Sequence, residues 1–398
     1  MTAIKKLTVY YHDEVVGYLA ETPDHMVAFQ YSDSWIRNGF SISPLSLPLN
    51  RNVFIPPDKC RERFNGMFGV FADCLPDSWG ELLLDRHLSD MGINKGEIGN
   101  LDRLAYVGKS GMGALEYYPE KETDFYIDSA GLNYDEIAKE CENILSSKHS
   151  AQLDILYRLG GSSGGTRPKI LLTDNEKDWI VKFPASKDPA ISGRREYDYS
   201  LCAKNCGINM TDTILLPSSV CDGYFKTERF DRRKGEKIFS VTFAGLLEAD
   251  FRAPSCDYST YMQLIRMLTK DREEDKEQMY RVMCFNILTH NRDDHTKNFT
   301  FLYTPDEGWR LSPAYDLTYS DTYWGEQTTS VAGKGKNISD TDLVKTGTDA
   351  GIPKTICEDC LEEIEIKTRA LEEYLGNKSL RKNKKIPIAK RITEIRSN

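Results

Sequence analysis

Hydrophobic and polar positions change their period several times along the chain. In the first 55 residues the segments LTVYYHD, EVVGYLAE and HMVAFQYS alternate and are separated by turn residues, which predicts short strands. A helix signal follows in SWGELLLDRHL, then Gly- and Tyr-rich loops, and a further helix is predicted from Tyr134 to about Ser146. The chain therefore begins with a β-rich unit.

From about residue 150 the pattern becomes loop, strand, turn, strand, helix and strand. KILLTD, the turn NEKD and WIVKFP form the first strand pair, REYDYSLCAKNCGI has helical spacing, and YFKTERFD is a further strand. Beyond residue 240, TYMQLIRMLTK and KEQMYRVMCFNILTH are amphipathic helices. We predict an α+β protein with a β-rich N-terminal subdomain (1–118), a small lobe (119–240) and a helical C-terminal lobe (241–398).

Composition and charge are those of an ordinary globular protein. The 398 residues are 40% hydrophobic and 28% charged, with a formal net charge of -9. Such a chain is a poor direct binder of nucleic acid, because phosphate contacts need an excess of Lys and Arg. The basic cluster between Lys378 and Arg391 is interpreted as a solvated tail, with an anionic partner as the alternative.

No apolar stretch approaches the ~20 residues that cross a bilayer, and the N-terminus lacks the apolar centre of a secretory signal. We expect no membrane contact and a cytoplasmic protein. The 10 cysteines are scattered, which indicates reduced thiols. A lone CxxC lacks the further ligands of a zinc site, and we expect its helix to bury one stripe: Ile356, Cys360, Ile364, Leu371 and Leu375.

The strongest signal for chemistry is NRDDHTKNFTFLY, residues 291–303. Asp293 and Asn298 have the spacing between the base and the metal-ligand asparagine of a protein-kinase catalytic loop. The base must accept the hydrogen bond of the attacking hydroxyl, while a neutral oxygen ligand helps to hold Mg²⁺ against the phosphates. Asp316 follows a predicted hairpin, where a kinase has its second metal carboxylate. These hard oxygen ligands suit Mg²⁺, with Mn²⁺ as the alternative.

Two assignments in this loop have alternatives. An Asp/Asn pair five apart is weak evidence by itself, because polar loops produce many. Asp294 competes with Asp293 for the role of base, and the spacing favours Asp293. His295 is predicted to be a hydrogen-bonded scaffold of the loop, with a direct nucleotide contact as the alternative.

A Gly-rich stretch and a strand lysine are the phosphate-binding candidates. The stretch allows backbone N–H groups to approach phosphate oxygens, although a flexible loop is the alternative; its glycines are Gly160, Gly161, Gly164 and Gly165. It matches neither a P-loop nor G-x-G-x-x-G. Lys182 lies in the strand WIVKFP, and Glu196 in the next helix is its candidate ion-pair partner.

The strand YFKTERF is the candidate connection between lobes, where the backbone of Glu228, Arg229 and Phe230 would meet the adenine edge. The Gly-rich stretch, lysine, glutamate, connecting strand, Asp/Asn loop, hairpin and second aspartate occur in the order of a protein kinase. That order predicts a protein-kinase-like two-lobed fold.

The motifs LGGSSGGTRPK, IVKFP, TERFDR, NRDDHTKNF and SPAYDL, with LPDSWG and LAYVGKSGMGAL upstream, resemble the HipA toxin kinases over nearly the whole chain. The resemblance implies a cytosolic bacterial serine/threonine protein kinase that uses ATP. It implies a helix-turn-helix antitoxin of the HipB type, so that DNA would be contacted only indirectly. Family members phosphorylate proteins, and some target aminoacyl-tRNA synthetases.

By this resemblance Asp293 is the catalytic base, Asn298 and Asp316 are the metal ligands, and Lys182 binds phosphate. The same resemblance implies further ATP contacts at Ser163, Gly164, Gly165, Thr166, His295 and Lys297. A serine of the phosphate loop is autophosphorylated in this family, which here indicates Ser162, with Ser163 as the alternative. Self-inactivation would follow.

The chain departs from the pattern of eukaryotic protein kinases in two ways, and two alternative functions remain. Asp316 is flanked by Tyr315 and Leu317 instead of the D-F-G pattern, and no A-P-E segment follows, so control by activation-loop phosphorylation is not expected. A small-molecule phosphotransferase would use the same base and metal ligands. A catalytically silent regulatory module is the other alternative, against which the base, the ligands and the lysine are all present.

Overall fold

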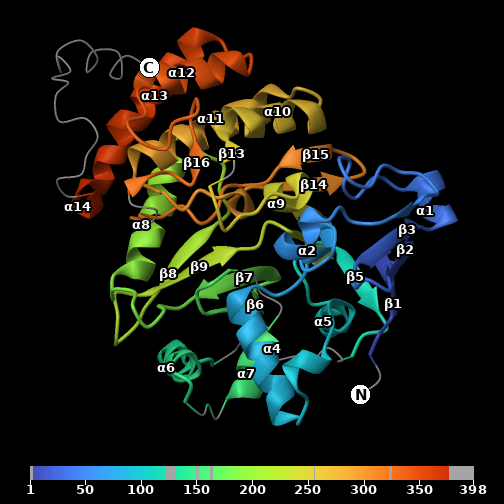
Figure 1. Ribbon diagram of the computed structural model, residues 1–398. Helices are drawn as coiled ribbons and strands as arrows, with labels where there is room; N and C mark the ends of the chain where they lie inside the picture. Colours follow the sequence, from blue (N-terminus) through green and yellow to red (C-terminus); the bar gives the residue numbers. More distant parts are fainter. Residues whose placement is uncertain are drawn as a thin grey trace, which may run out of the picture.

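Figure 1 shows the computed structural model of the chain, which describes residues 3–121, 131–148, 150, 152–161, 165–254, 256–321 and 325–375. The N-terminal part forms a five-stranded sheet in the order β4-β3-β2-β1-β5. Its strands are β1 (Lys6–Tyr11), β2 (Glu14–Glu21), β3 (Val27–Tyr31), β4 (Val53–Phe54) and β5 (Leu115–Tyr118). The three strands predicted in the first 55 residues are therefore confirmed.

Short helices accompany this sheet. They are α1 (Asp33–Asn38), α2 (Lys59–Arg63), α3 (Gly69–Ala72), α4 (Ser78–Asp90) and α5 (Asn100–Val107), with a 3-10 turn at Lys95–Glu97. α4 is the helix predicted from SWGELLLDRHL. Leu83, Leu84 and Leu88 lie on its buried face, as the spacing of a helix requires.

The small lobe is a four-stranded antiparallel sheet with helices around it. The strand order is β6-β7-β9-β8, formed by β6 (Lys169–Asp174), β7 (Lys177–Lys182), β8 (Thr213–Leu216) and β9 (Tyr224–Glu228). The helices are α6 (Tyr134–Leu145), α7 (Leu153–Gly160) and α8 (Ser192–Asn205). The predicted strand, turn, strand, helix and strand are present in that order, but β8, between α8 and β9, was not predicted.

The described residues from Phe239 to Leu375 form the mostly helical lobe. Its helices are α9 (Phe243–Leu247), α10 (Tyr258–Leu268), α11 (Glu273–Leu288), α12 (Asp340–Asp349), α13 (Lys354–Lys367) and α14 (Glu372–Leu375). A small sheet in the order β12-β14-β15 consists of β12 (Phe239–Thr242) and the predicted hairpin of β14 (Thr300–Thr304) and β15 (Gly308–Leu311). β10 (Arg232–Arg233) pairs with β11 (Glu236–Lys237), and β13 (Cys256–Asp257) pairs with β16 (Thr329–Ser330). The fold class is α+β with the kinase-like order of lobes.

Two hydrophobic cores cross the predicted domain boundaries. One joins the N-terminal sheet to α8, α10, α11 and α13. The other joins α4 to α6, α7 and the small-lobe sheet, with Trp79 and Leu83 beside Ile170 and Val181. The first 118 residues are thus built into both lobes, and α4 lies alongside α7 below the small-lobe sheet (Figure 1).

A close contact between two glycines joins the N-terminal part to the helical lobe. A Cβ atom on Gly69 of α3 would lie 2.3 Å from the carbonyl oxygen of Gly245 in α9. That approach leaves no room for a side chain larger than hydrogen at Gly69. Phe40 also stacks on Tyr303 with ring centroids 3.8 Å apart, so the N-terminal part and the helical lobe are packed together.

The buried stripe predicted around the CxxC is confirmed except at its first position, and it runs from α13 through a 3-10 turn at Thr368–Leu371 into α14. Cys360, Ile364, Leu371 and Leu375 are buried, but Ile356 is 39% exposed and Cys357 takes the inner position. All ten cysteines lie in the described part of the chain and are free thiols.

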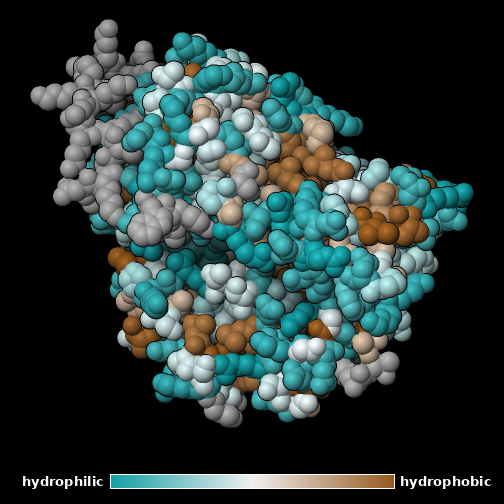
Figure 2. Space-filling model, in the orientation of Figure 1, coloured by the Kyte–Doolittle hydropathy of each residue, from teal (hydrophilic) through white to brown (hydrophobic). Residues whose placement is uncertain are grey.

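Polar side chains dominate the face of the molecule that Figure 2 shows. The face in Figure 2 is mostly hydrophilic, and its hydrophobic residues gather in separate patches. Within the described residues, none of the helices combines the length and the hydropathy needed to span a membrane.

Candidate active site

The loop after α11 brings Asp293 and Asn298 together. A 3-10 turn at Thr296–Asn298 reverses the chain, and His295 caps it by accepting the Lys297 N–H at Nδ1, 3.2 Å away. Asn298 Nδ2 then donates to the Asp293 carbonyl oxygen at 2.7 Å. The five-residue spacing therefore closes a compact loop, and it leaves Asn298 Oδ1 as the amide atom with metal-ligand chemistry.

The two neighbouring aspartates have opposite environments. The Asp294 carboxylate is buried and accepts hydrogen bonds from Tyr258 Oη (2.8 Å), Gln327 Nε2 (3.2 Å) and the Thr329 N–H (3.0 Å). This burial raises the pKa of Asp294 to about 6. The Asp293 side chain is 50% exposed. Of the two carboxylates, only that of Asp293 is accessible to an incoming hydroxyl.

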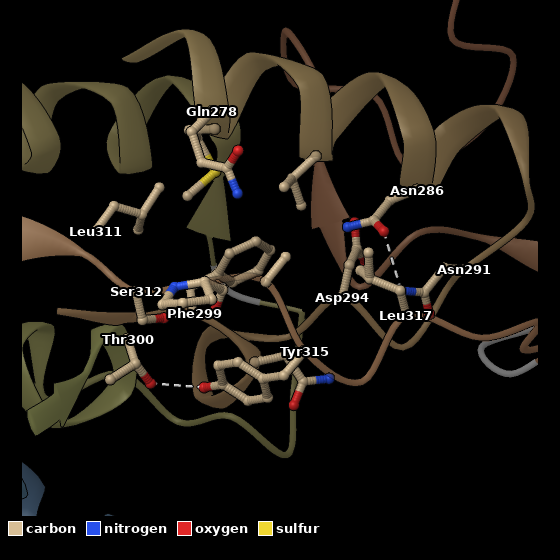
Figure 3. A pocket seen from close by; sticks show the side chains of 15 residues that line it. Gln278, Asn286, Asn291, Asp294, Phe299, Thr300, Leu311, Ser312, Tyr315 and Leu317 are labelled. Atoms are coloured by element: carbon tan, nitrogen blue, oxygen red, sulfur yellow. Dashed lines mark hydrogen bonds between the residues drawn. The ribbon is translucent and has the colours of Figure 1, made fainter. Parts of the chain in front are cut away.

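A small cavity lies beneath this loop. Figure 3 looks into it: Gln278 and Asn286 extend from α11, and Asn291 donates to Asn286 Oδ1 at 3.0 Å. On the opposite side Tyr315 bonds to Thr300 at 2.6 Å. The cavity measures about 20 Å³, room for roughly one water molecule. It belongs to the packing under the loop and is far too small for a nucleotide.

Lys182 lies between two acidic side chains from different elements. Its Nζ atom is 2.6 Å from Oε1 of Glu196 in α8, and it also contacts the Asp316 carboxylate. Glu196 is buried, and a buried carboxylate needs a nearby positive charge such as this lysine. The lysine–glutamate pair predicted from sequence order is thus present, and it meets the second predicted aspartate.

The backbone around Asp316 is held against the catalytic loop. Asp316 has φ +53, an unusual conformation for a residue other than glycine. Asn291 Nδ2 donates to its carbonyl oxygen at 3.4 Å, and the neighbouring Tyr315 Oη donates to the Lys297 carbonyl at 2.7 Å. Such conformations persist where the surroundings fix them, and they cluster at functional sites.

A metal would have few protein ligands here. Within the described ranges, His, Cys, Asp and Glu side chains form no group of three or more that could hold a metal ion. Mg²⁺ is commonly held by one or two carboxylates together with substrate phosphates and water. Asn298 and Asp316 therefore fit a metal that arrives with a nucleotide.

Lys297 makes a contact that was not predicted. Its Nζ atom is 2.6 Å from Oδ1 of Asp77, which precedes α4, and lies 4.4 Å from the centroid of the Phe251 ring. The other carboxylate oxygen, Asp77 Oδ2, accepts the Gly165 N–H at 3.1 Å. Although burial opposes it, the Lys297 charge and the Gly165 N–H lower the pKa of Asp77.

The described end of the Gly-rich stretch crosses a buried lysine. Gly165 has φ +90, which favours glycine, and an added Cβ would lie 2.5 Å from Lys169 Nζ. Burial and the nearby Lys182 charge lower the pKa of Lys169 to about 7. Thr166 is exposed. The predicted residues Ser162, Ser163 and Gly164 lie outside the described residues.

The predicted adenine-binding residues line a separate groove. Glu228, Arg229 and Phe230 border a groove of about 1410 Å³ whose lining contains none of the predicted catalytic or metal-binding residues. The Glu228 N–H donates to the Asp212 carbonyl at 2.9 Å, and the Arg229 N–H donates to that of Asp178 at 2.8 Å. These two N–H groups are therefore engaged within the protein.

The comparisons with known proteins agree with this arrangement. The HipA-like C-terminal domain family matches residues 161–371, and the HipA N-terminal domain family matches residues 7–118. The chain belongs to the HipA family of kinases.

Similar proteins of this family come from Shewanella oneidensis. The serine/threonine-protein kinase toxin HipA of that organism is 26% identical over 361 residues, which cover 81% of this chain and 77% of the relative. A solved complex of Shewanella oneidensis MR-1 HipA, HipB and operator DNA matches with a TM-score of 0.66 at 19% identity. That match covers 93% of this chain and 90% of the other. The likeness shows a common fold.

In this HipA-family kinase the segment after Asp316 returns to the catalytic loop. Arg292 Nη1 lies 2.5 Å from Asp321 Oδ1, and Arg292 Nη2 lies 2.9 Å from His290 Nδ1. Thr328 Oγ1 donates to the Arg292 carbonyl at 2.6 Å. A carboxylate thus binds the arginine that precedes the candidate base.

Sequence reasoning gave no role to Asp77, although LPDSWG was among the motifs of the resemblance. The feature that distinguishes it is a contact with Lys297, 220 positions away. The available signal was an aspartate directly before a predicted helix, which indicates a cap more often than a site residue.

Proposed function

We propose that this HipA-family kinase is an ATP-dependent serine/threonine protein kinase that acts as a HipA-like toxin. The observation that carries the proposal is the contact of Lys182 with both Glu196 and Asp316. In protein kinases a strand lysine paired with a helix glutamate binds the phosphates, and an aspartate beside it holds the metal. Here all three groups meet, although they come from two lobes.

The roles of the residues follow from their charges and exposure. Lys182, Asn298 and Asp316 would hold MgATP, and the metal would neutralise charge on the phosphates. The exposed Asp293 carboxylate would accept the hydrogen bond of a serine or threonine hydroxyl and orient it for in-line attack. Because burial lowers the pKa of His295, its imidazole is neutral near pH 7 and can serve as a neutral hydrogen-bonding group near the nucleotide.

A labelling experiment tests this function. The wild-type protein, incubated with labelled ATP, Mg²⁺ and a bacterial lysate, should label protein bands, and Asp293→Asn should not. Transfer of label only to small molecules would support a small-molecule phosphotransferase instead. The absence of any transfer under these conditions would support a silent regulatory module.

We further propose a small HipB-like helix-turn-helix protein as partner, with DNA contacted only through it. The proposal is supported by family membership and by the HipA–HipB–DNA complex of the structural relative. Co-expression with the product of a neighbouring helix-turn-helix gene should give a stable complex on size-exclusion chromatography. Separate elution of the two proteins would contradict it.

Self-inactivation through Ser162, with Ser163 as the alternative, completes the proposal. A phosphoserine adds about -1.5 to -2 charges, which would repel a bound triphosphate. Mass spectrometry after incubation with ATP should find the modification in the wild type and not in Asp293→Asn. An active preparation whose Gly-rich stretch stays unmodified would contradict this part of the proposal alone.

A further inference from the structure

Gly165, at the end of the Gly-rich stretch, is bonded on both sides of its backbone to the N-terminal part of the chain. Its N–H donates to Asp77 Oδ2 at 3.1 Å, and its carbonyl oxygen accepts the Trp79 N–H at 3.3 Å. Asp77 and Trp79 stand at the start of α4. Both polar groups of this one residue are therefore fixed by a helix that lies about 90 positions earlier.

The residues that hold Gly165 are themselves rigidly placed. The Trp79 side chain is fully buried, and its Nε1 atom donates to the Lys169 carbonyl at 3.0 Å. Leu83 and Leu84 anchor α4 in the core beneath the small-lobe sheet. Groups carried by a packed helix keep their geometry better than groups carried by a loop. Asp77 is therefore a fixed point against which Gly165 is placed.

Asp77 also reaches the catalytic loop from the same position. Its Oδ1 atom is 2.6 Å from Lys297 Nζ, and the side chains of Lys297 and Asp77 are only 14% and 27% exposed. A charge-assisted hydrogen bond shielded from solvent is stronger than a surface ion pair. One carboxylate thus joins three parts of the molecule: the N-terminal part, the Gly-rich stretch and the catalytic loop.

We infer that Asp77 is a positioning residue for the nucleotide. It sets the spacing between Gly165 and Lys297, which belong to the two walls between which the proposed function places the phosphates. The inference rests on that proposed function and extends it, because it makes the HipA N-terminal domain a part of the nucleotide site. Without Asp77, binding of the phosphates would have to order both walls, and that cost would weaken affinity.

Steady-state kinetics of Asp77→Asn and Asp77→Ala test the inference. Both variants should raise the KM for MgATP, Asp77→Ala by about tenfold, with kcat changed less than about threefold. Glu81→Gln is the matched control, because Glu81 lies on the same helix with its side chain 53% exposed. This control should leave both constants unchanged. A purely structural role would instead lower the yield of folded protein and kcat without this split.

The opposite result would overturn the inference. An unchanged or lower KM in Asp77→Ala would mean that the carboxylate does not position the nucleotide, and a lower KM would show that it repels the phosphates. Absence of transfer by the wild type would remove the proposed function together with this inference. An active wild type with an unaffected Asp77→Ala variant would remove the inference alone.

A double-mutant cycle separates contact from a general effect on folding. Adding Asp77→Asn to Lys297→Met should raise the KM little further, because Lys297→Met already removes the ammonium that Asp77 holds. Fully additive effects would contradict the assigned contact. Calorimetric titration with MgATP gives the same comparison for a variant too slow to assay.

Discussion

The two sides of the candidate site are held in different ways. On the catalytic side, Asp294 bonds to Tyr258, Gln327 and Thr329, all within the helical lobe. On the phosphate side, Gly165 and Lys297 are both bonded to Asp77, which belongs to the N-terminal part. Asp294 is thus supported by its own lobe, whereas Gly165 and Lys297, which lies in the same loop as Asp294, are bonded to a distant segment of the chain.

This difference separates chemistry from binding. Changes at Asp293 or Asp294 should alter turnover or local stability, and changes at Asp77 or Lys297 should alter nucleotide affinity. The N-terminal part shares both hydrophobic cores with the kinase-like lobes, so it can supply such a contact with fixed geometry. The following experiments test whether the two sides behave separately.

The largest effect is expected at the junction of the two sides. Asp316→Ala should abolish Mg²⁺-dependent ATP binding, because it removes the proposed carboxylate ligand and leaves the neutral Asn298 amide as the remaining protein ligand of the metal. Lys182→Ala should weaken binding and turnover together. Isothermal titration with MgATP measures the affinity of each of the two variants. Unchanged affinity in the two variants would contradict the kinase arrangement as a whole.

A large effect confined to chemistry is expected at the base. Asp293→Asn keeps the shape of the side chain and removes its charge, so phosphoryl transfer should fall by ~10²-fold or more. The affinity for MgATP should change little, because the carboxylate faces the acceptor. If this variant kept near wild-type turnover and Asp294→Asn were inactive yet folded, the assignment would be reversed.

Asp294→Asn should act mainly on stability. The amide can keep only part of the hydrogen bonds that the buried carboxylate accepts, which should lower the free energy of unfolding by about 1–3 kcal/mol. Chemical denaturation measures this cost. Asp293→Asn is the control, because its half-exposed side chain should change stability by less than about 0.5 kcal/mol.

The stability of the wild type and that of Asp294→Asn should depend differently on pH. Burial raises the pKa of Asp294 to about 6, so the folded protein holds this proton more tightly than the unfolded chain does. The stabilisation of the folded protein by this proton is fully present below about pH 4 and is lost as the pH rises through 6. The free energy of unfolding of the wild type, relative to Asp294→Asn, should fall by about 3 kcal/mol over that interval. A flat difference would contradict the buried, proton-binding carboxyl.

The smallest effect is expected at the pair of Arg292 and Asp321. The Asp321 side chain is 49% exposed although that of Arg292 is only 14% exposed, and an ion pair whose carboxylate is open to solvent contributes about 0–1 kcal/mol. Asp321→Asn should therefore change the free energy of unfolding by less than about 1 kcal/mol. The single charge reversal Asp321→Arg should lower the free energy of unfolding. The double variant Arg292→Asp/Asp321→Arg should restore the free energy that the single reversal loses. An effect larger than that of Asp294→Asn would show that this segment matters more than its exposure indicates.

The sequence by itself determined the features that depend on neighbours along the chain. Hydrophobic periods located the N-terminal strands, α4, α11 and the hairpin of β14 and β15, because strands and helices repeat every 2 and 3.6 residues. Spacing paired Asp293 with Asn298, since one 3-10 turn joins them. The order of motifs brought Lys182 and Glu196 together as predicted, although neither residue was informative alone.

Only the tertiary structure decided what depends on distant neighbours. Asp293 and Asp294 are identical side chains in consecutive positions, and contacts with Tyr258 and Thr329, some 36 positions away, bury one of them. The role of Asp77 comes from a lysine 220 positions later. On α13, packing buried Cys357 and left Ile356 exposed, although periodicity had favoured Ile356. Burial and charge compensation are properties of a residue's surroundings in space, so no local pattern could have assigned them.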